Sequence, residues 1–131
     1  MVLGCLRNAT VAGEYLARAL VTGRSVAVIA AGERWSADGS LRPALEDQLG
    51  AGAVLHALAE AGHREKFSPE VVASEALYQV SRVRLGVTMR DCVSGRELWA
   101  KGFGADVEIA ADVDAATIVP VLVDGAFRAN E

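Results

Sequence analysis

Cysteine is scarce in this sequence, and its placement excludes two common structural roles. Only Cys5 and Cys92 occur among 131 residues, and neither belongs to a CxxC or Cys/His spacing. Zinc sites and disulfide frameworks require closer or more numerous cysteines, so neither is expected. Two reduced thiols are typical of a cytoplasmic protein, which is the localisation that we predict.

Long apolar runs and an excess of positive charge are also lacking. The sequence has no run of about 18 apolar residues, so no membrane span is expected, and its N-terminus, MVLGCLRNA, does not resemble a secretory signal. Acidic residues outnumber basic ones by 17 to 13, and the basic residues are scattered. Nucleic-acid binding is therefore not expected, whereas a small anionic ligand needs only a few local donors.

The residues that are abundant indicate a small aliphatic core. Hydrophobic residues make up 52% of the chain and aromatic residues only 5%, so Ala, Val and Leu must supply most of any core. The length fits one domain or one piece of a larger domain. We therefore predict a single α/β domain over residues 1–131.

The first third of the chain predicts a strand, a helix and a second strand. Residues 2–6 form a short apolar run, and Asn8 is placed to cap a helix that Gly23 would end. Residues 25–31, SVAVIAA, are apolar at consecutive positions, as in a strand buried on both faces. This order predicts a βαβ unit, in which the two strands are parallel.

The rest of the chain alternates polar turns with helical patterns and closes on a strand. Residues 32–43 are polar and rich in turn formers, and they follow the predicted strand at the edge where α/β sheets bind ligands. Ser68 and Pro69 mark a helix start, and Pro120 favours an edge position for the last strand. The predicted helices cover residues 43–61, 68–85, 88–101 and 106–111, and the predicted strand covers residues 117–123.

Four pieces of the chain, taken in order, resemble the 2-phosphosulfolactate phosphatase family. The most distinctive is GERWSADGSLRPALEDQLGAGAV, residues 32–54, where Leu-Glu-Asp and Gly-Ala follow a strand and loop. The others are LGCLRNA (3–9), SGRELWAKGFGADVEIAADVD (94–114) and IVPVLVDGAF (118–127). No single piece is diagnostic, but the occurrence of four pieces in the same order as in the family makes the resemblance fairly specific.

The resemblance implies a fold, an activity and a cofactor. It implies a three-layer α/β/α fold with a parallel or mixed sheet, and magnesium-dependent hydrolysis of a small anionic phosphate ester, 2-phosphosulfolactate, to sulfolactate and phosphate on the route to coenzyme M. Members of the family are longer and carry Asp-Val-hydrophobic-Arg-Ala-Thr, Gly-Glu-Arg-Asn-Gly and Thr-Asn-Gly-Thr segments, none of which occurs here. The chain therefore resembles the C-terminal part of a family member.

Glu46 and Asp47 are the candidate catalytic residues, although the metal ligands themselves cannot be assigned from the sequence. Mg²⁺ is commonly held by one or two carboxylates together with waters and a phosphate. Acids in the first turn of a helix also complement its dipole without any catalytic duty. Adjacent helix residues diverge by about 100°, which argues against both side chains reaching one site.

Four further residues are candidates for substrate binding, each with a simpler alternative. Arg34 and Arg42 could bind phosphate or sulfonate oxygens in a bidentate fork, and Glu33 lies in the same loop. All three could equally be solvated loop charges. Asn8 could expose backbone N–H groups to an anion, or it could merely cap the helix.

Two other classes of function remain open. The chain could be a truncated, non-catalytic homologue that acts as an oligomerising or binding module, or a generic α/β protein of another function. A strand edge exposed near the N-terminus and the Ala/Val-rich surface would promote association, so we predict a homo-oligomer, most simply a symmetric dimer. We also predict little phosphatase activity from this chain alone.

Overall fold

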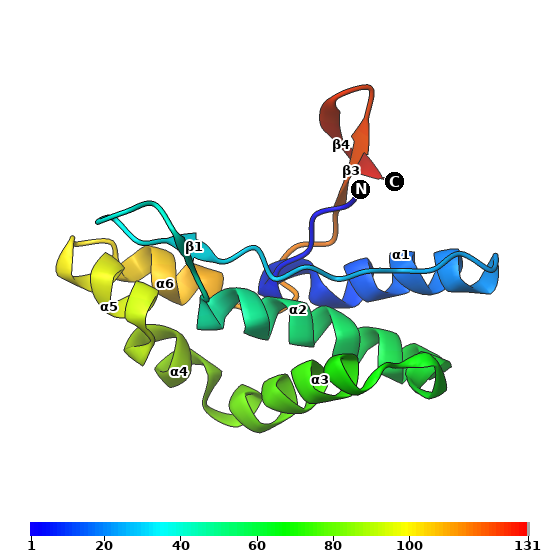
Figure 1. Ribbon diagram of the computed structural model, residues 1–131, viewed down its shortest axis with the longest axis horizontal. Helices are drawn as coiled ribbons and strands as arrows, with labels where there is room; N and C mark the ends of the chain where they lie inside the picture. Colours follow the sequence, from blue (N-terminus) through cyan, green and yellow to red (C-terminus); the bar gives the residue numbers. More distant parts are fainter. Residues whose placement is uncertain (131) are drawn as a thin grey trace.

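Three helices form one layer, and the middle helix has the most buried residues of the three. The protein is described by a computed structural model over residues 1–130; Glu131 lies outside the described residues. Helix α2 (Leu45–Leu58) packs between α1 (Ala9–Val21) and α3 (Pro69–Ser81), as Figure 1 shows. Leu49 and Ala53 of α2 are almost fully buried at the centre of the core.

Glycines allow these helices to approach closely. A Cβ atom on Gly13 would lie 2.6 Å from the Ala57 Cβ, and one on Gly52 would lie 2.6 Å from the Ser74 carbonyl oxygen. Both distances are shorter than real Cβ contacts. The two glycines therefore permit the α1–α2 and α2–α3 contacts, because any side chain would push the helices apart.

The helix signals at Ser68, Pro69 and Gly23 are confirmed. Ser68 caps α3, since its Oγ accepts a hydrogen bond from Val71 N, and Pro69 occupies the first turn. Gly23 and Gly62, at the ends of α1 and of the π-helical turn Ala59–His63, have φ of 80° and 88°. Such left-handed angles suit glycine and stop a helix.

The second half of the chain continues in short helices. A 3₁₀ turn links α3 to α4 (Leu85–Asp91), which leads to α5 (Val93–Ala100) and α6 (Gly104–Ala110). The predicted helix over residues 88–101 is therefore interrupted at Cys92, which caps α5 through its sulfur. Residues 106–111, predicted as helix, fall almost entirely in α6.

The chain closes on a β-hairpin. Strand β3 (Val119–Val123) confirms the predicted last strand, and it pairs antiparallel with β4 (Ala126–Asn130). Asp124 and Gly125 both have positive φ, 51° and 79°, as a two-residue turn between such strands requires. The sequence reading did not predict β4, although the Asp-Gly pair is a recognised hairpin signal.

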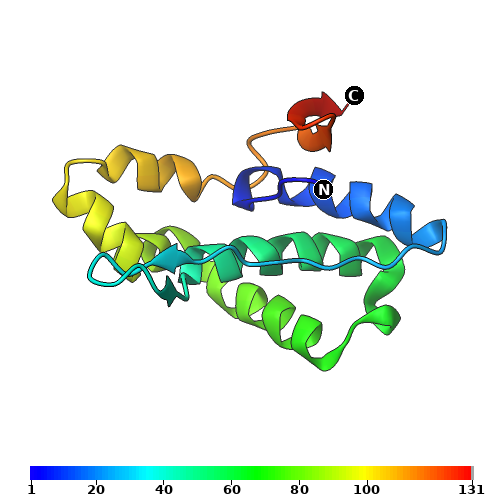
Figure 2. The same cartoon turned by 45° about the horizontal axis from the view of Figure 1, so that its top comes forward.

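The predicted parallel sheet does not form, and this prediction requires correction. Residues near 2–6 meet β3 instead, through an antiparallel bridge between Val2 and Val121. Residues 25–31 are extended but belong to no sheet, and a second hairpin, β1 (Glu33–Arg34) with β2 (Leu41–Arg42), follows them. Figures 1 and 2 show that the two segments run in the same direction along the helices, as a βαβ path requires.

Residues 2–6 and 25–31 do not form a sheet because no strand lies between them to pair with both. A cavity separates them, so their backbone groups do not reach one another. The described chain is thus a mixed helical structure with two small antiparallel hairpins. None of the helices within residues 1–130 has the length and apolar character needed to cross a membrane.

Candidate active site

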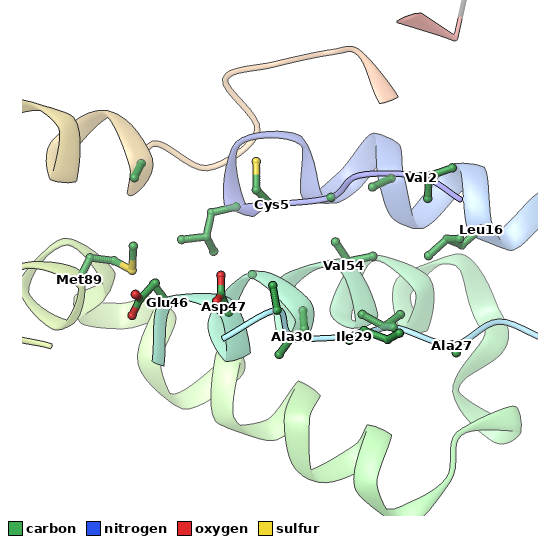
Figure 3. A pocket seen from close by; sticks show the side chains of 18 residues that line it. Val2, Cys5, Leu16, Ala27, Ile29, Ala30, Glu46, Asp47, Val54 and Met89 are labelled. Atoms are coloured by element: carbon green, nitrogen blue, oxygen red, sulfur yellow. The ribbon is translucent and has the colours of Figure 1, made fainter. Parts of the chain in front are cut away.

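A cavity of about 330 Å³ lies between the N-terminal segment and residues 27–31. Its floor comes from α1 and α2, including Ala12, Gly50 and Val54, so most of its lining is apolar. Figure 3 shows the two exceptions, Glu46 and Asp47, at the end of the cavity near Met89 and Cys5. The structure therefore brings both candidate catalytic carboxylates to one cavity, despite their adjacent positions in the helix.

Asp47 is held in place by the backbone at the end of the extended segment. Its Oδ2 accepts a hydrogen bond from Gly32 N at 2.7 Å. Gly32 has φ of 75°, a conformation that turns its N–H towards α2 and that residues with a Cβ rarely adopt. Both Glu46 and Asp47 lie in the first turn of α2, where acidic side chains complement the helix dipole.

Glu46 also contacts a thiol. Cys92 Sγ lies 3.7 Å from Glu46 Oε2 and donates more closely to the Met89 carbonyl oxygen at 3.1 Å. Burial raises the pKa of Cys92, and the Glu46 charge raises it further, against a lowering contribution from Gly95 N–H. Cys92 is therefore held as a neutral thiol, which does not suit a nucleophile.

The other loop candidates lie outside this cavity. Arg42 is buried, forms an ion pair with Glu97 at 3.3 Å and lies over the Trp35 ring at 5.4 Å. Arg34 donates to the Gly39 carbonyl oxygen within its own hairpin, and Glu33 is exposed in β1. The five predicted loop and helix residues thus do not converge on one concavity, because the β1–β2 hairpin folds back on itself.

Asn8 binds the protein's own backbone. Its Oδ1 accepts from Cys5 N at 2.8 Å, while Nδ2 donates to the carbonyl oxygens of Leu3 and Ile118 at 3.3 and 3.0 Å. The predicted side-chain cap of α1 is absent; Asp114 instead accepts from Thr10 N at 2.8 Å. The Asp114 carboxylate therefore already occupies the N-terminus of α1, the place where an anionic ligand was considered from the sequence.

A second polar cluster, which the sequence reading missed, centres on Glu75. This fully buried carboxylate accepts through Oε1 from His56, Arg64 and Gln79, and its Oε2 lies 2.8 Å from Arg64 Nη2 without hydrogen-bonding geometry. Arg82, which can only donate, lies 3.1 Å from His56 Nε2. His56 Nδ1 therefore carries the proton that Glu75 accepts.

The charge of Glu75 is maintained by these partners. Burial by itself would raise the pKa of Glu75, but hydrogen bonds from His56, Arg64 and Gln79 and the Arg64 charge lower it below its ordinary value. The cluster ties α2 to α3 and to the turn that precedes α3. Its only signal in the sequence would have been the spacing of Glu75 and Gln79 at i and i+4.

The described residues define a mixed α/β protein with a mostly apolar cavity that carries a carboxylate pair at one end. The model of the 2-phosphosulpholactate phosphatase family matches residues 1–125, and the chain belongs to that family. This confirms the resemblance seen in the sequence. Comparison with curated proteins gave no match, and neither did comparison with solved structures.

Proposed function

We propose that the chain takes part in the hydrolysis of a small phosphate monoester, 2-phosphosulfolactate or a close relative, with Mg²⁺ as cofactor. Family membership supports the substrate class. The observation that carries the proposal is the presence of Glu46 and Asp47 at one end of the same cavity. Sulfolactate and inorganic phosphate would be the products.

The carboxylate pair fits Mg²⁺ in its common sparse mode of binding. Mg²⁺ usually retains several waters and takes one or two protein carboxylates plus substrate phosphate oxygens. Within residues 1–130 no group of three or more His, Cys, Asp or Glu side chains could hold a metal, so waters and substrate would complete the set. When bound, Mg²⁺ would stabilise developing negative charge on the phosphoryl oxygens.

The residues of the chain would orient water and accept a proton. No protein hydrogen bond within residues 1–130 engages Asp47 Oδ1 or Glu46 Oε1, whereas Gly32 N fixes the other Asp47 oxygen. The free oxygens could hold the attacking water and receive its proton as the bond from water oxygen to phosphorus forms and the ester oxygen–phosphorus bond breaks, and that proton could then pass to the leaving sulfolactate oxygen. The apolar walls would exclude bulk water from that end of the cavity.

Magnesium binding can be tested independently of turnover. We expect Mg²⁺ to raise the unfolding temperature of the chain, because a ligand that binds only the folded state stabilises it. Asp47→Asn and Glu46→Gln should lose this shift. Glu108→Gln, which makes the same change at an exposed position on α6, should keep it. An equal Mg²⁺ shift in all four proteins would contradict the assigned metal site.

Turnover can be tested with 2-phosphosulfolactate and Mg²⁺, with EDTA as the control. We expect turnover well below the ordinary enzymatic range of about 1 per second or faster, and a further loss of about 100-fold or more in Asp47→Asn. A monomer that turns over at an ordinary rate would contradict the low activity predicted for the chain alone. Wild-type rates in both carboxylate variants would contradict their proposed role.

A non-catalytic binding or oligomerising module is the second candidate. It is favoured by the apolar surface of the extended segment, where the Ile29 side chain is 84% exposed. Such surfaces commonly mark sites of association. We also propose that the functional form has the three-layer arrangement of the family, with α1, α2 and α3 as one layer. A symmetric dimer, testable by light scattering, remains our prediction for the oligomeric state.

A further inference from the structure

One wall of the cavity that holds Glu46 and Asp47 is an extended segment without backbone partners. No hydrogen bond joins residues 25–31 to another part of the described chain; the nearest ones are made by Arg24 N and Gly32 N at either end. Burial alternates from Val26 to Ile29, since Val26 and Val28 are half-buried while Ala27 and Ile29 are exposed. Alternation with period two is the pattern of a strand with one face on helices.

The opposite wall is paired along one edge only. Leu3 N donates to the Pro120 carbonyl oxygen, and Leu122 N donates to the Met1 carbonyl oxygen. Because strand residues alternate in direction, the N–H and C=O groups of Val2 and Gly4 point to the other edge. No hydrogen bond within residues 1–130 engages these groups, and both residues line the cavity.

The floor between the walls is apolar and built largely of small residues. It includes Ala12, Gly50 and Ala51, with the larger Val54 and Leu16 beside them. A Cβ on Gly50 would meet only ordinary contacts, 3.8 Å from Cys5 Cα and Leu6 N. Backbone can therefore pass close above this floor, with small apolar side chains pointing down onto it.

We propose that this cavity is a slot for one β-strand supplied by a separate polypeptide. The strand would bond to Val2 and Gly4 on one side and to residues 25–31 on the other, joining the β3–β4 hairpin to a continuous sheet. Unpaired donors and acceptors along both walls favour a backbone as the occupant, because the free edge of a strand is a template for pairing with another chain. The apolar floor and the uncharged 25–31 wall require an extended segment with small apolar residues at alternate positions.

The strand and the proposed ester site would share the cavity without competing for the same groups. The strand uses backbone groups and the apolar floor, whereas the ester would use the carboxylates of Glu46 and Asp47 at one end. A strand bound in the slot would cover the apolar surface beside Glu46 and Asp47. The proposal stands independently of the ester hydrolysis, because it depends on no carboxylate.

Hydrogen exchange of the intact chain tests the slot with a defined probe. The probe is the peptide acetyl-Lys-Val-Ala-Val-Ala-Val-Thr-amide at millimolar concentration. We expect exchange at Gly4 and at every second residue within 26–30, whose N–H groups would face the slot, to be fast in the chain alone and to slow at least about tenfold with the peptide. The same peptide N-methylated at alternate residues lacks strand donors on one edge and should give no protection.

A pair of variants locates the effect in the cavity. Ala51→Leu fills the floor and should abolish the protection by the peptide. Ala105→Leu, the same change at an exposed position on α6, should preserve it. Protection that survives Ala51→Leu, or that the N-methylated peptide reproduces, would overturn the proposal.

Two results in the absence of peptide would also overturn it. Slow exchange at residues 26–30 in a monomer would mean that the two walls close on each other. Exchange could instead become slow only as the protein concentration rises, with a dimeric mass by light scattering. That result would mean that a second copy of this chain fills the slot. If millimolar peptide does not slow hydrogen exchange at these residues, the slot does not bind a β-strand of this kind, and the proposal is rejected.

Discussion

Asn8 joins two ends of the chain, and replacing its amide by a carboxylate should expose that role. Asn8→Asp keeps an oxygen to accept from Cys5 N but removes both Nδ2 hydrogen bonds, to Leu3 and Ile118. The side chain is 5% exposed, so water cannot readily replace the lost donors. Losing each of these part-buried hydrogen bonds costs about 0.5–1.5 kcal/mol, which gives a loss of about 1–3 kcal/mol at neutral pH.

The loss should depend on pH in a defined direction. The two carbonyl oxygens repel a carboxylate, so the introduced acid should have a folded-state pKa above its unfolded value of about 3.9. A group with a raised folded pKa contributes its stability below the unfolded pKa and loses it as pH rises through the folded pKa. The variant should therefore recover part of its stability near pH 4, where the protonated acid can donate one hydrogen bond.

Chemical denaturation followed by circular dichroism, at pH 4 and pH 7, measures this difference. Gln48→Glu is the matched control, because it makes the same amide-to-acid change at an exposed position of α2, and it should stay within about 0.5 kcal/mol of the parent. If Asn8→Asp also stays within that range at pH 7, Asn8 does not clamp the N-terminal segment to residue 118. The free side chain would then suit the ligand-binding role that the sequence suggested.

Three further predictions concern the helical layer. Glu75→Gln should lower stability by about 1–3 kcal/mol, because it removes the charge that accepts hydrogen bonds from His56 and from the half-exposed Arg64. The pKa of Glu75 is lowered in the folded state, so the loss of stability in the variant should be full above about pH 4.5 and should shrink below it. Denaturation at several pH values measures this loss. A loss that does not change with pH would exclude the Glu75 charge as its cause. Gly52→Ala should lower the free energy of unfolding by about 1–3 kcal/mol, measured by thermal unfolding. Gly86→Ala is the control: a Cβ has free space there, so the free energy of unfolding should rise by up to about 1 kcal/mol. Equal effects of the two substitutions would refute the close α2–α3 contact. Ser68→Ala should lose about 1 kcal/mol with its cap, and no change in unfolding temperature would show that the cap contributes nothing.

The sequence alone predicted the elements whose causes are local. Helix α3 begins at Ser68 and Pro69 because a hydroxyl and a fixed φ act within one turn, and Gly23 ends α1 because only its own φ is needed. The strand near residues 117–123 was also predicted from local composition. Family membership followed from the order of four short segments and was confirmed over residues 1–125.

Strand pairing and the fate of most site candidates were decided by the tertiary structure. Residues 25–31 have the composition of a buried strand, but a strand pairs only where a lateral neighbour exists, and here a cavity takes that place. Arg42 and Glu75 look alike in sequence as isolated charges. Packing makes one the partner of Glu97 and the other the centre of a buried cluster. Glu46 and Asp47 reach a common cavity because the cavity wraps around the first turn of α2, a geometry that helix periodicity by itself cannot supply.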